Sequence, residues 1–314
     1  MSRNPPNTQL SPQSIEQRLG AQSNRYGERL IKSVLVLAAL ISVATTIGIV
    51  IALLQPAIEF FQSINFIDFI TGTRWAPLFE PADFGVVPLL VGTSIVVMYA
   101  CAIGLTFGLG SAIFLSEYAR PRTRKILKPA LEVLEGIPTV VYGFFALIFI
   151  TPLIQDIGLN IQVFNPLSAG IVMGVMLIPT VASVAEDAMH AVPQEIRAGA
   201  YGLGASRFHV STRIVVPAAL SGIIAGFVLG ISRAVGETVI VLIAAGGLAQ
   251  ITIDPREPIQ TMTAFIAAAG QGDVPTGSIE YKTIFAVGLT LFVITLAINI
   301  LSIRLVKKYR EVYE

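Results

Sequence analysis

Charged side chains are scarce in this chain of 314 residues, because Asp, Glu, Lys and Arg together make up only 13% of it. Soluble proteins usually carry about 25% of charged residues. The 21 basic and 20 acidic residues are too few to cover a water-soluble globule of this size, while hydrophobic residues reach 54%. This composition excludes a soluble enzyme and a disordered chain, and it indicates a membrane protein with several spans.

The chain also lacks residues that several kinds of chemistry require. A single cysteine, Cys101, excludes an intrachain disulfide framework. The sequence contains no G-x-x-x-x-G-K-[ST] loop, which would bind the phosphates of ATP. The two histidines, His190 and His209, form no H-E-x-x-H motif, and no metal-binding or nucleophilic group of residues is visible. Uphill transport by such a chain would need energy from a partner or from an ion gradient.

Long uncharged runs indicate where membrane-spanning helices lie. A helix needs about 20 mostly apolar residues to cross the hydrocarbon core, whereas barrel strands would alternate over about ten residues. We therefore predict an all-α integral membrane protein with six transmembrane helices. Their approximate ranges are 33–58, 86–113, 134–155, 167–189, 214–245 and 283–305. The uncharged segment 258–272 is too short and too polar to span, and it is predicted to be a surface or re-entrant segment.

The basic residues predict the orientation of these spans. Seventeen of the 21 Lys and Arg residues lie at the two ends of the chain and in the loops after the second and fourth spans. The opposite loops hold only Arg74, Arg256 and Lys282. Both termini are therefore predicted to be cytoplasmic. Residues 1–28 are polar, without the apolar core of a signal peptide, and are predicted to be a mobile cytoplasmic tail preceding a transmembrane domain at 29–314.

One further basic residue, Arg233, lies inside the fifth predicted span, four residues before Glu237. On a continuous helix these two charges and three glycines, Gly222, Gly226 and Gly230, share a sector of about 80°. Small residues at this spacing let another helix approach closely, so the glycines are predicted to be packing positions and the charges to face the protein interior or a cavity. The two charges can pair at i, i+4. Either this pair only locks helices together, or it is a polar point on the path of an anion, which a guanidinium binds through two hydrogen bonds.

Two glutamates, Glu132 and Glu135, open the third predicted span. Acidic side chains are favourable at a helix N-terminus, where the helix dipole is positive. We interpret them as stabilising that end of the span, with a role on a transport path as the alternative.

The loop at 186–216 is predicted to contain a short helix. Pro193 suits the first turn of a helix, Gly204 is a stop signal, and Ser206 can cap the helix that follows. An apolar stripe at helical spacing is formed by Ile196, Ala200 and Leu203. Such a helix is only about 15 Å long and has little apolar area to bury. It is either an ordinary interfacial loop or a docking site for a soluble partner.

In this loop the sequence resembles the permease subunits of bacterial ATP-binding-cassette (ABC) importers. Gly204, followed after nine residues by Ile214 and then by Val216-Pro217, is similar to the G-x9-I-x-L-P half of their EAA loop. The first half departs from that pattern, because Ala198-Gly199-Ala200 lacks its glutamate. Whether Glu195, three residues earlier, takes its place is left open.

Further segments resemble the PstC-type permease of phosphate-specific importers, and the similarity covers about residues 29–306. In chain order they are Trp75-Ala76-Pro77, Phe84-Gly85 with Gly92-Thr93, EGIPTVVYG at 135–143, AYGLGA at 200–205 and RAVGET at 233–238. The resemblance implies a type I ABC importer permease fold. It places a shared five-helix core at about 84–306, an added first helix before it, and an ATPase-docking loop at about 186–213.

The resemblance also implies a function: a multi-pass subunit of the bacterial inner (plasma) membrane that moves inorganic phosphate into the cytoplasm. Arg233 and Glu237 match the charged pair that the family associates with phosphate passage. The docking residues that it implies are Glu195, Arg197, Ala200, Tyr201, Gly202, Gly204 and Ala205. No cofactor is expected on this chain, since ATP and Mg²⁺ would bind to two ATP-binding-cassette partner subunits. The other expected partners are a second permease of the PstA type, a periplasmic phosphate-binding protein and the lipid bilayer, with no nucleic acid.

Besides a purely scaffolding membrane protein, two alternative transport functions stay open. One is a permease of the same class for another oxyanion, such as sulfate or molybdate. The other is an ion-coupled secondary transporter, which would work without an ATPase and would be expected to contain inverted repeats. The sequence contains no convincing repeat.

Overall fold

The computed structural model of the protein describes residues 25–272 and 274–309. Residues 1–24 of the predicted mobile tail at 1–28 lie outside the described residues. The last four residues of that predicted tail belong to a helix, which begins at Arg25. The chain divides into two compact units, one ending at Ala52 and the other beginning at Leu53.

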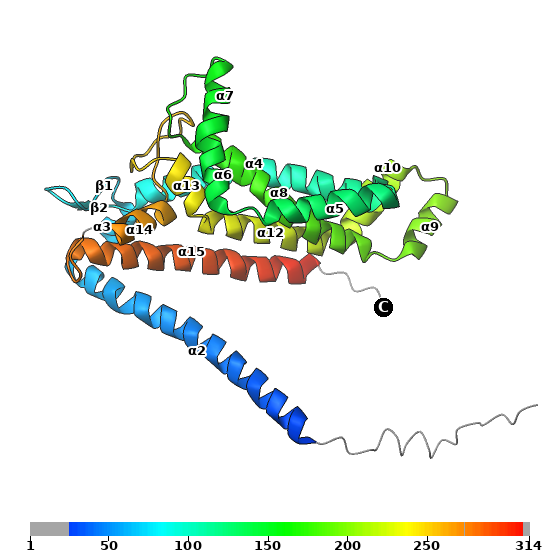
Figure 1. The fold of residues 1–314 in the computed structure, drawn as a ribbon, viewed down its shortest axis with the longest axis horizontal. Coiled ribbons are helices and arrows are strands. Elements are labelled where there is room, and N and C mark those ends of the chain that lie inside the picture. The colour runs from blue at the N-terminus through cyan, green and yellow to red at the C-terminus, as the bar shows by residue number, and fades with distance from the viewer. Residues whose placement is uncertain (1–24, 273, 310–314) are drawn as a thin grey trace, which may run out of the picture. The chain divides into compact units, whose positions relative to one another are not determined.

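The first unit is the N-terminal part of α2 (Arg25–Ser63), which Figure 1 shows as one long helix. Every side chain from Gly27 to Ile49 is exposed in this chain, including large apolar ones such as Leu35 and Leu40. From Ser33 onward this part of α2 has no charged residue, and a helix with an apolar surface on all sides is stable only in lipid or against other protein. This part of α2 therefore agrees with the first predicted span.

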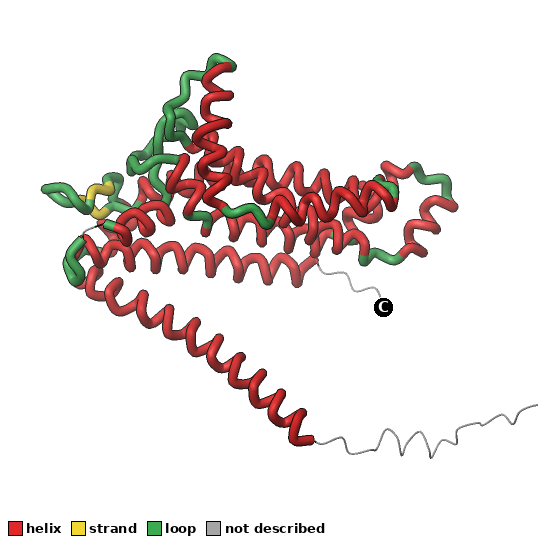
Figure 2. The backbone as a smooth tube through the Cα atoms, viewed as in Figure 1, coloured by secondary structure: helices red, strands yellow, loops and turns green. Residues whose placement is uncertain are grey.

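The second unit begins with an aromatic cluster around the end of α2. The segment after α2 contains α3 (Phe66–Thr71) and two short antiparallel strands, β1 (Trp75–Ala76) and β2 (Asp83–Phe84), which are yellow in Figure 2. The ring of Trp75 stands perpendicular to that of Phe265, with centroids 4.9 Å apart. Phe265 belongs to the helix at Met262–Gln271, so this contact packs β1 against a helix of the bundle.

Helices make up most of the rest of this unit. The first half contains α4 (Val87–Ile113), the π-helical turn η1 (Phe114–Tyr118), α5 (Pro121–Glu135), α6 (Thr139–Phe145), the π-helical turn η2 (Ala146–Ile150), α7 (Thr151–Asp156) and α8 (Pro166–His190). The second half contains α9 (Gln194–Gly202), α10 (Arg207–Val210), the π-helical turn η3 (Ser211–Val215), α11 (Val216–Ala218), α12 (Leu220–Gly236), α13 (Val239–Ala244), α14 (Met262–Gln271) and α15 (Ile279–Tyr309).

Helix α8 forms the centre of the bundle and contacts α4, α5, α12 and α13. Its N-terminus is capped by Asn165, whose side chain accepts a hydrogen bond from the backbone N–H of Ser168. Glycines bring α4 and α8 close together: a Cβ added at Gly104 would lie 2.7 Å from that of Leu177, and one at Gly174 would lie 2.7 Å from that of Ile103. Small residues thus give this bundle the close packing typical of membrane helices.

The structure confirms the all-α class and the approximate number of spans. Five described helical segments are long and apolar enough to cross a membrane, and a sixth is obtained if one bent pair counts as a single span. That pair, Arg207–Ala218 and Leu220–Gly236, is bent by 73°. The uncharged segment 258–272 contains α14, a helix of 10 residues that packs on α13 and α15.

Two predicted boundaries are wrong. The third span does not begin at 134, because α5 ends at Glu135 and the next helix begins at Thr139. Pro138 separates the two, since proline disfavours helical geometry in the residue before it. The fifth span is not one helix over 214–245, because the chain bends before Leu220 and α12 ends at Gly236.

Candidate functional site

The end of α12 separates the two charges that the sequence places together. Glu237 has an extended backbone, with φ −65° and ψ 130°. Its carboxylate Oε1 accepts hydrogen bonds from the backbone N–H groups of Val239 at 3.0 Å and Ile240 at 3.2 Å. Its carbonyl accepts a bond of 2.7 Å from the hydroxyl of Thr263 in α14. Glu237 therefore fixes the start of α13, and the predicted i, i+4 pair with Arg233 is wrong because no continuous helix joins them.

Arg233 instead forms a cluster with two residues from other helices, which we call the Arg233 cluster. Its Nη1 lies 2.9 Å from Glu135 Oε1 at the end of α5 and 2.9 Å from Thr180 Oγ1 in α8. The hydroxyl of Thr180 donates to the same Glu135 oxygen, again at 2.9 Å. The side chains of Arg233 and Glu135 are 33% and 41% exposed. Three helices thus join at one polar point that is open to the surface of this chain.

The position of Glu135 overturns its interpretation as an acid at a helix N-terminus. Glu135 is the last residue of α5 and Glu132 lies in the same final turn. A carboxylate at that end meets the negative pole of the helix dipole, so it gains nothing from the helix itself. Its ion pair with Arg233 supplies the missing favourable interaction, and it links residues that are 98 positions apart.

The glycines of α12 face α8, as Gly222, Gly226 and Gly230 were predicted to face a neighbouring helix. A Cβ added at Gly226 would lie 3.3 Å from that of Val184, and one at Gly230 would lie 3.0 Å from Cγ2 of Val181. At Gly222 the added atom would overlap with the Cβ of Ala188. This close approach holds Arg233 at hydrogen-bonding distance from α8.

The predicted docking loop forms α9 and the turn that follows it. The helix begins after Pro193, and Ser206 caps α10 by accepting a hydrogen bond from the backbone N–H of His209 at 3.3 Å. Gly204 has φ +81°, a left-handed conformation that favours glycine. Leu203 at the tip is 91% exposed. The turn therefore presents a large apolar side chain to whatever lies beyond this end of the bundle.

Six of the seven docking residues that the resemblance implies divide into two groups. Glu195, Tyr201, Gly202 and Gly204 are exposed. Ala200 and Ala205 instead pack against the apolar cluster at the end of α8, which contains Met189.

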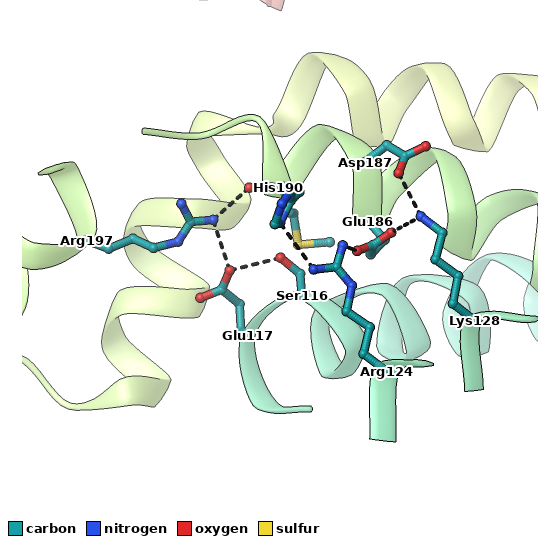
Figure 3. A network of polar contacts seen from close by, with 9 residues as sticks. Ser116, Glu117, Arg124, Lys128, Glu186, Asp187, His190 and Arg197 are labelled. Carbon is teal, nitrogen blue, oxygen red and sulfur yellow. Dashed lines mark hydrogen bonds and ion pairs between the residues drawn. The ribbon is translucent and has the colours of Figure 1, made fainter. Parts of the chain in front are cut away.

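Arg197, the remaining docking residue, points inward and holds α9 on the bundle (Figure 3). Its Nη2 lies 3.1 Å from Glu117 Oε1 in η1 and donates to the carbonyl of Met189 at 2.7 Å. Its Nη1 donates to the carbonyl of Val192. Side-chain exposure is 8% for Arg197 and 4% for Glu117. We call these contacts the α9 clamp, and they exclude Arg197 as a surface contact in this structure.

A second ion-pair network near the α9 clamp is not visible in the sequence (Figure 3). Glu186 of α8, with a side chain only 1% exposed, pairs with Arg124 and Lys128 of α5, the latter at 2.7 Å. Lys128 also lies 3.0 Å from Asp187. The hydrogen bond to Glu186, with a smaller contribution from Asp187, raises the pKa of Lys128. Arg124 and Lys128, which lie between the second and third predicted spans, therefore do more than orient the chain. Their ion pairs hold the amphipathic helix α5 against α8.

Metal binding has no support in the described part of the chain. Within residues 25–272 and 274–309, no group of three or more His, Cys, Asp or Glu side chains is placed to hold a metal ion. Among the polar groups that the structure brings together, the Arg233 cluster, the α9 clamp and the Glu186 network involve the predicted site residues or lie next to them. All three consist of ion pairs between helices.

Comparison with known proteins gives a consistent result. Residues 104–311 match the family model of binding-protein-dependent transport system inner membrane components. A probable ABC transporter permease protein, YqgH of Bacillus subtilis, is 32% identical over 99% of this chain and 100% of its own length. The phosphate transport system permease protein PstC of Mesorhizobium japonicum is 30% identical over 83% of this chain and 84% of its own length.

Solved structures add agreement in fold alone. A bacterial alginate ABC transporter, crystallised in complex with an alginate pentasaccharide-bound periplasmic protein, has a chain that matches with a TM-score of 0.62 at 15% identity. The match covers 89% of this chain and 94% of that one. The helical bundle described above is therefore that of a type I ABC importer permease, and the chain belongs to the family of binding-protein-dependent transport system inner membrane components.

Proposed function

We propose that this chain is the permease subunit through which an ATP-driven importer moves inorganic phosphate into the cytoplasm, and that Arg233 is a polar point on the path. The name of the PstC relative supports phosphate as the substrate. The observation that carries the proposal is the Arg233 cluster, an open guanidinium at the end of an otherwise apolar helix, 2.9 Å from partners on two other helices.

Physical cost supports a functional role for this guanidinium. A charged side chain inside a membrane span is costly, so intramembrane charges usually mark a substrate pathway. A guanidinium also fits an oxyanion, because its N–H groups can donate two parallel hydrogen bonds. Glu135 partly neutralises Arg233, which keeps the attraction for an anion weak enough for release.

Glu237 has a different part in this proposal. Its carboxylate caps α13, and its carbonyl is bonded to Thr263 of α14. Movement of α13 or α14 relative to α12 would break these bonds. We infer that Glu237 shapes the path beside Arg233 by fixing this break in the helix, while Arg233 contacts the anion.

The energy would come from separate subunits. In this proposal two ATP-binding-cassette subunits bind ATP and Mg²⁺, and one of them receives α9 together with the exposed tip at Leu203. The α9 clamp then transmits the closure of the ATPases to η1 and α8, because Arg197 bonds to both. A second permease of the PstA type completes the path, and a periplasmic phosphate-binding protein delivers the substrate.

Phosphate uptake by cells without their own phosphate permease tests this function. The chain is expressed with a second permease, ATPase subunits and a phosphate-binding protein, and uptake of radiolabelled phosphate and sulfate is measured in parallel. Restored phosphate uptake that requires the ATPase supports the proposal. Restored sulfate uptake in its place would assign the chain to another oxyanion, and uptake that persists without the ATPase would make it a secondary transporter.

A further inference from the structure

The hydrogen bonds of the Arg233 cluster use only half of each charged group. They engage one guanidinium nitrogen, Nη1, and one carboxylate oxygen, Oε1 of Glu135. Within the described residues, no hydrogen bond engages Nη2 or Nε of Arg233, or Oε2 of Glu135. Donors and an acceptor therefore remain side by side at one open position.

This combination distinguishes two kinds of oxyanion. Near neutral pH, inorganic phosphate keeps at least one proton, so it carries an O–H donor as well as acceptor oxygens. Sulfate carries acceptor oxygens only. A guanidinium alone binds either anion, whereas a carboxylate beside it accepts a hydrogen bond from the P–OH group and repels an anion that has no proton to donate.

We propose that Glu135 is the specificity-determining residue of the transport path and that, with Arg233, it forms a site for a protonated oxyanion. This inference rests on the proposed function and extends it to the choice of anion. The free N–H groups of Arg233 donate to the unprotonated oxygens, and Oε2 of Glu135 accepts from the P–OH. Sulfate at the same position faces the Glu135 carboxylate without a hydrogen bond between them.

Thr180 orients the carboxylate in this site. Its hydroxyl donates to Oε1 of Glu135 and accepts from Nη1 of Arg233, so both bonds lie on the same side of the ion pair. This arrangement leaves Oε2 and the remaining N–H groups as the open side. Thr180 is itself only 6% exposed and lies on α8, the most deeply packed helix, which gives the carboxylate a rigid support.

The exposure of the two charged side chains makes the site reachable. At 33% and 41%, neither Arg233 nor Glu135 is sealed inside the bundle, so an anion can approach the ion pair without separating it. Because the guanidinium is already paired, the net attraction for an anion is small. The site therefore selects by hydrogen-bond pattern more than by charge, which suits a path that must release what it binds.

Anion binding to the complete purified transporter tests the inference. Equilibrium dialysis with radiolabelled phosphate and with radiolabelled sulfate gives the ratio of the two affinities, without the binding protein selecting first. Glu135→Gln is expected to reduce the preference for phosphate by about tenfold or more, because the neutral amide no longer repels sulfate and can donate to it. Arsenate, which is also protonated near neutral pH, should bind like phosphate in both proteins.

Matched variants keep the outcomes distinct. Glu132→Gln changes a glutamate one turn earlier on α5 for which the described residues form no ion pair, so it should leave the ratio unchanged. Should Glu135→Gln fail to assemble, Thr180→Val removes the hydroxyl that orients the carboxylate and should also lower the ratio, with Thr180→Ser restoring it. An unchanged ratio in Glu135→Gln, or in Thr180→Val where that variant is needed, overturns the inference. If Arg233→Gln still abolishes phosphate uptake in that case, the proposed function stands without it.

Discussion

Arg197 of α9 lies 3.1 Å from Glu117 of η1, and the two residues are 80 positions apart in the chain. Both side chains are nearly inaccessible, at 8% and 4% exposure. The short helix at the tip of the bundle is therefore joined to the end of α4 by a buried ion pair. Because the same guanidinium also bonds to carbonyls at the end of α8, α9 cannot move without moving these two helices.

Arg197→Met should detach α9 from the bundle. Removing one partner of a buried ion pair leaves an uncompensated charge and costs about 3–5 kcal/mol. We expect amide hydrogen exchange in residues 194–204 to accelerate by about a hundredfold or more. The measurement is exchange mass spectrometry of the purified complex.

The double variant Arg197→Met with Glu117→Gln is the control for this experiment. It removes the stranded carboxylate, so part of the lost protection should return. In the single variant, ATP hydrolysis should continue while phosphate uptake falls. Unchanged exchange in 194–204 would show that the ion pair does not hold α9.

The stabilisation that Lys128 gives to the complex should be lost at alkaline pH. Its pKa is raised from the ordinary value of 10.5 by the hydrogen bond to Glu186. A raised pKa means that the stabilisation is fully present below the ordinary value and is lost as the pH rises through the raised one. Lys128→Met should therefore have a lower melting temperature than the unchanged chain at pH about 8, and the two melting temperatures should converge as the pH rises through the raised pKa of Lys128.

Lys125→Met provides the comparison for the pH experiment. Lys125 is an exposed lysine of the same helix, and it forms no ion pair with the described residues. Its replacement should leave the melting temperature nearly unchanged across the same pH range. A constant difference between Lys128→Met and the unchanged chain at every pH would contradict the assignment of the effect to this lysine.

Gly222 should tolerate no side chain. An added methyl group would overlap with that of Ala188, so Gly222→Ala should destabilise the chain by about 1–3 kcal/mol through overpacking. Combining it with Ala188→Gly moves the methyl group to the other helix and should restore most of the loss. Thermal unfolding of Gly222→Ala and of the double variant checks this, and Gly110→Ala is a control because nothing lies within 4 Å of its added Cβ. If the double variant were no more stable than Gly222→Ala, the helices would not meet at this point.

The sequence predicts the spans well where apolar runs end at charged or capping residues. The fourth predicted span, 167–189, nearly coincides with α8, which is Pro166–His190. The predicted fifth span, 214–245, is wrong at its end. Apolar residues continue after Gly236, but the carboxylate of Glu237 caps a new helix there. A run of apolar residues predicts a membrane span, but it does not show where the backbone hydrogen bonds of the helix are interrupted.

The candidate site could be predicted only in part for a related reason. Arg233 is conspicuous in the sequence because it is a charge in an apolar run. Its partner Glu135 is not, because the ion pair joins residues 98 positions apart and the i, i+4 rule offered Glu237 instead. Arg197 likewise lies in a polar loop, where an arginine is expected to be exposed. Only the tertiary structure places it opposite Glu117.

Leu203 should anchor the contact with the ATPase. It is an apolar side chain with 91% exposure at the tip of the α9 turn. Leu203→Glu should reduce co-purification of the ATPase subunits and lower ATP-dependent uptake by about tenfold, because it places a carboxylate in an apolar contact and a loss of about 1.4 kcal/mol is tenfold in affinity. Ile253→Glu is the control. Ile253 has the same size as leucine and is 86% exposed in another loop, so its replacement should leave co-purification intact. Equal ATPase recovery with both variants would mean that α9 is not the docking element.

ATP-driven phosphate uptake into proteoliposomes that contain the complete transporter with Arg233→Gln shows whether Arg233 takes part in phosphate transport. The variant keeps a hydrogen-bonding side chain but removes the positive charge from the path. The expected result is that the complex assembles and hydrolyses ATP, while phosphate uptake falls by about a hundredfold or more, the loss typical of removing a charged group that binds a substrate. Uptake at the rate of the unchanged transporter would contradict the account, and loss of assembly would show that Arg233 only holds α5, α8 and α12 together.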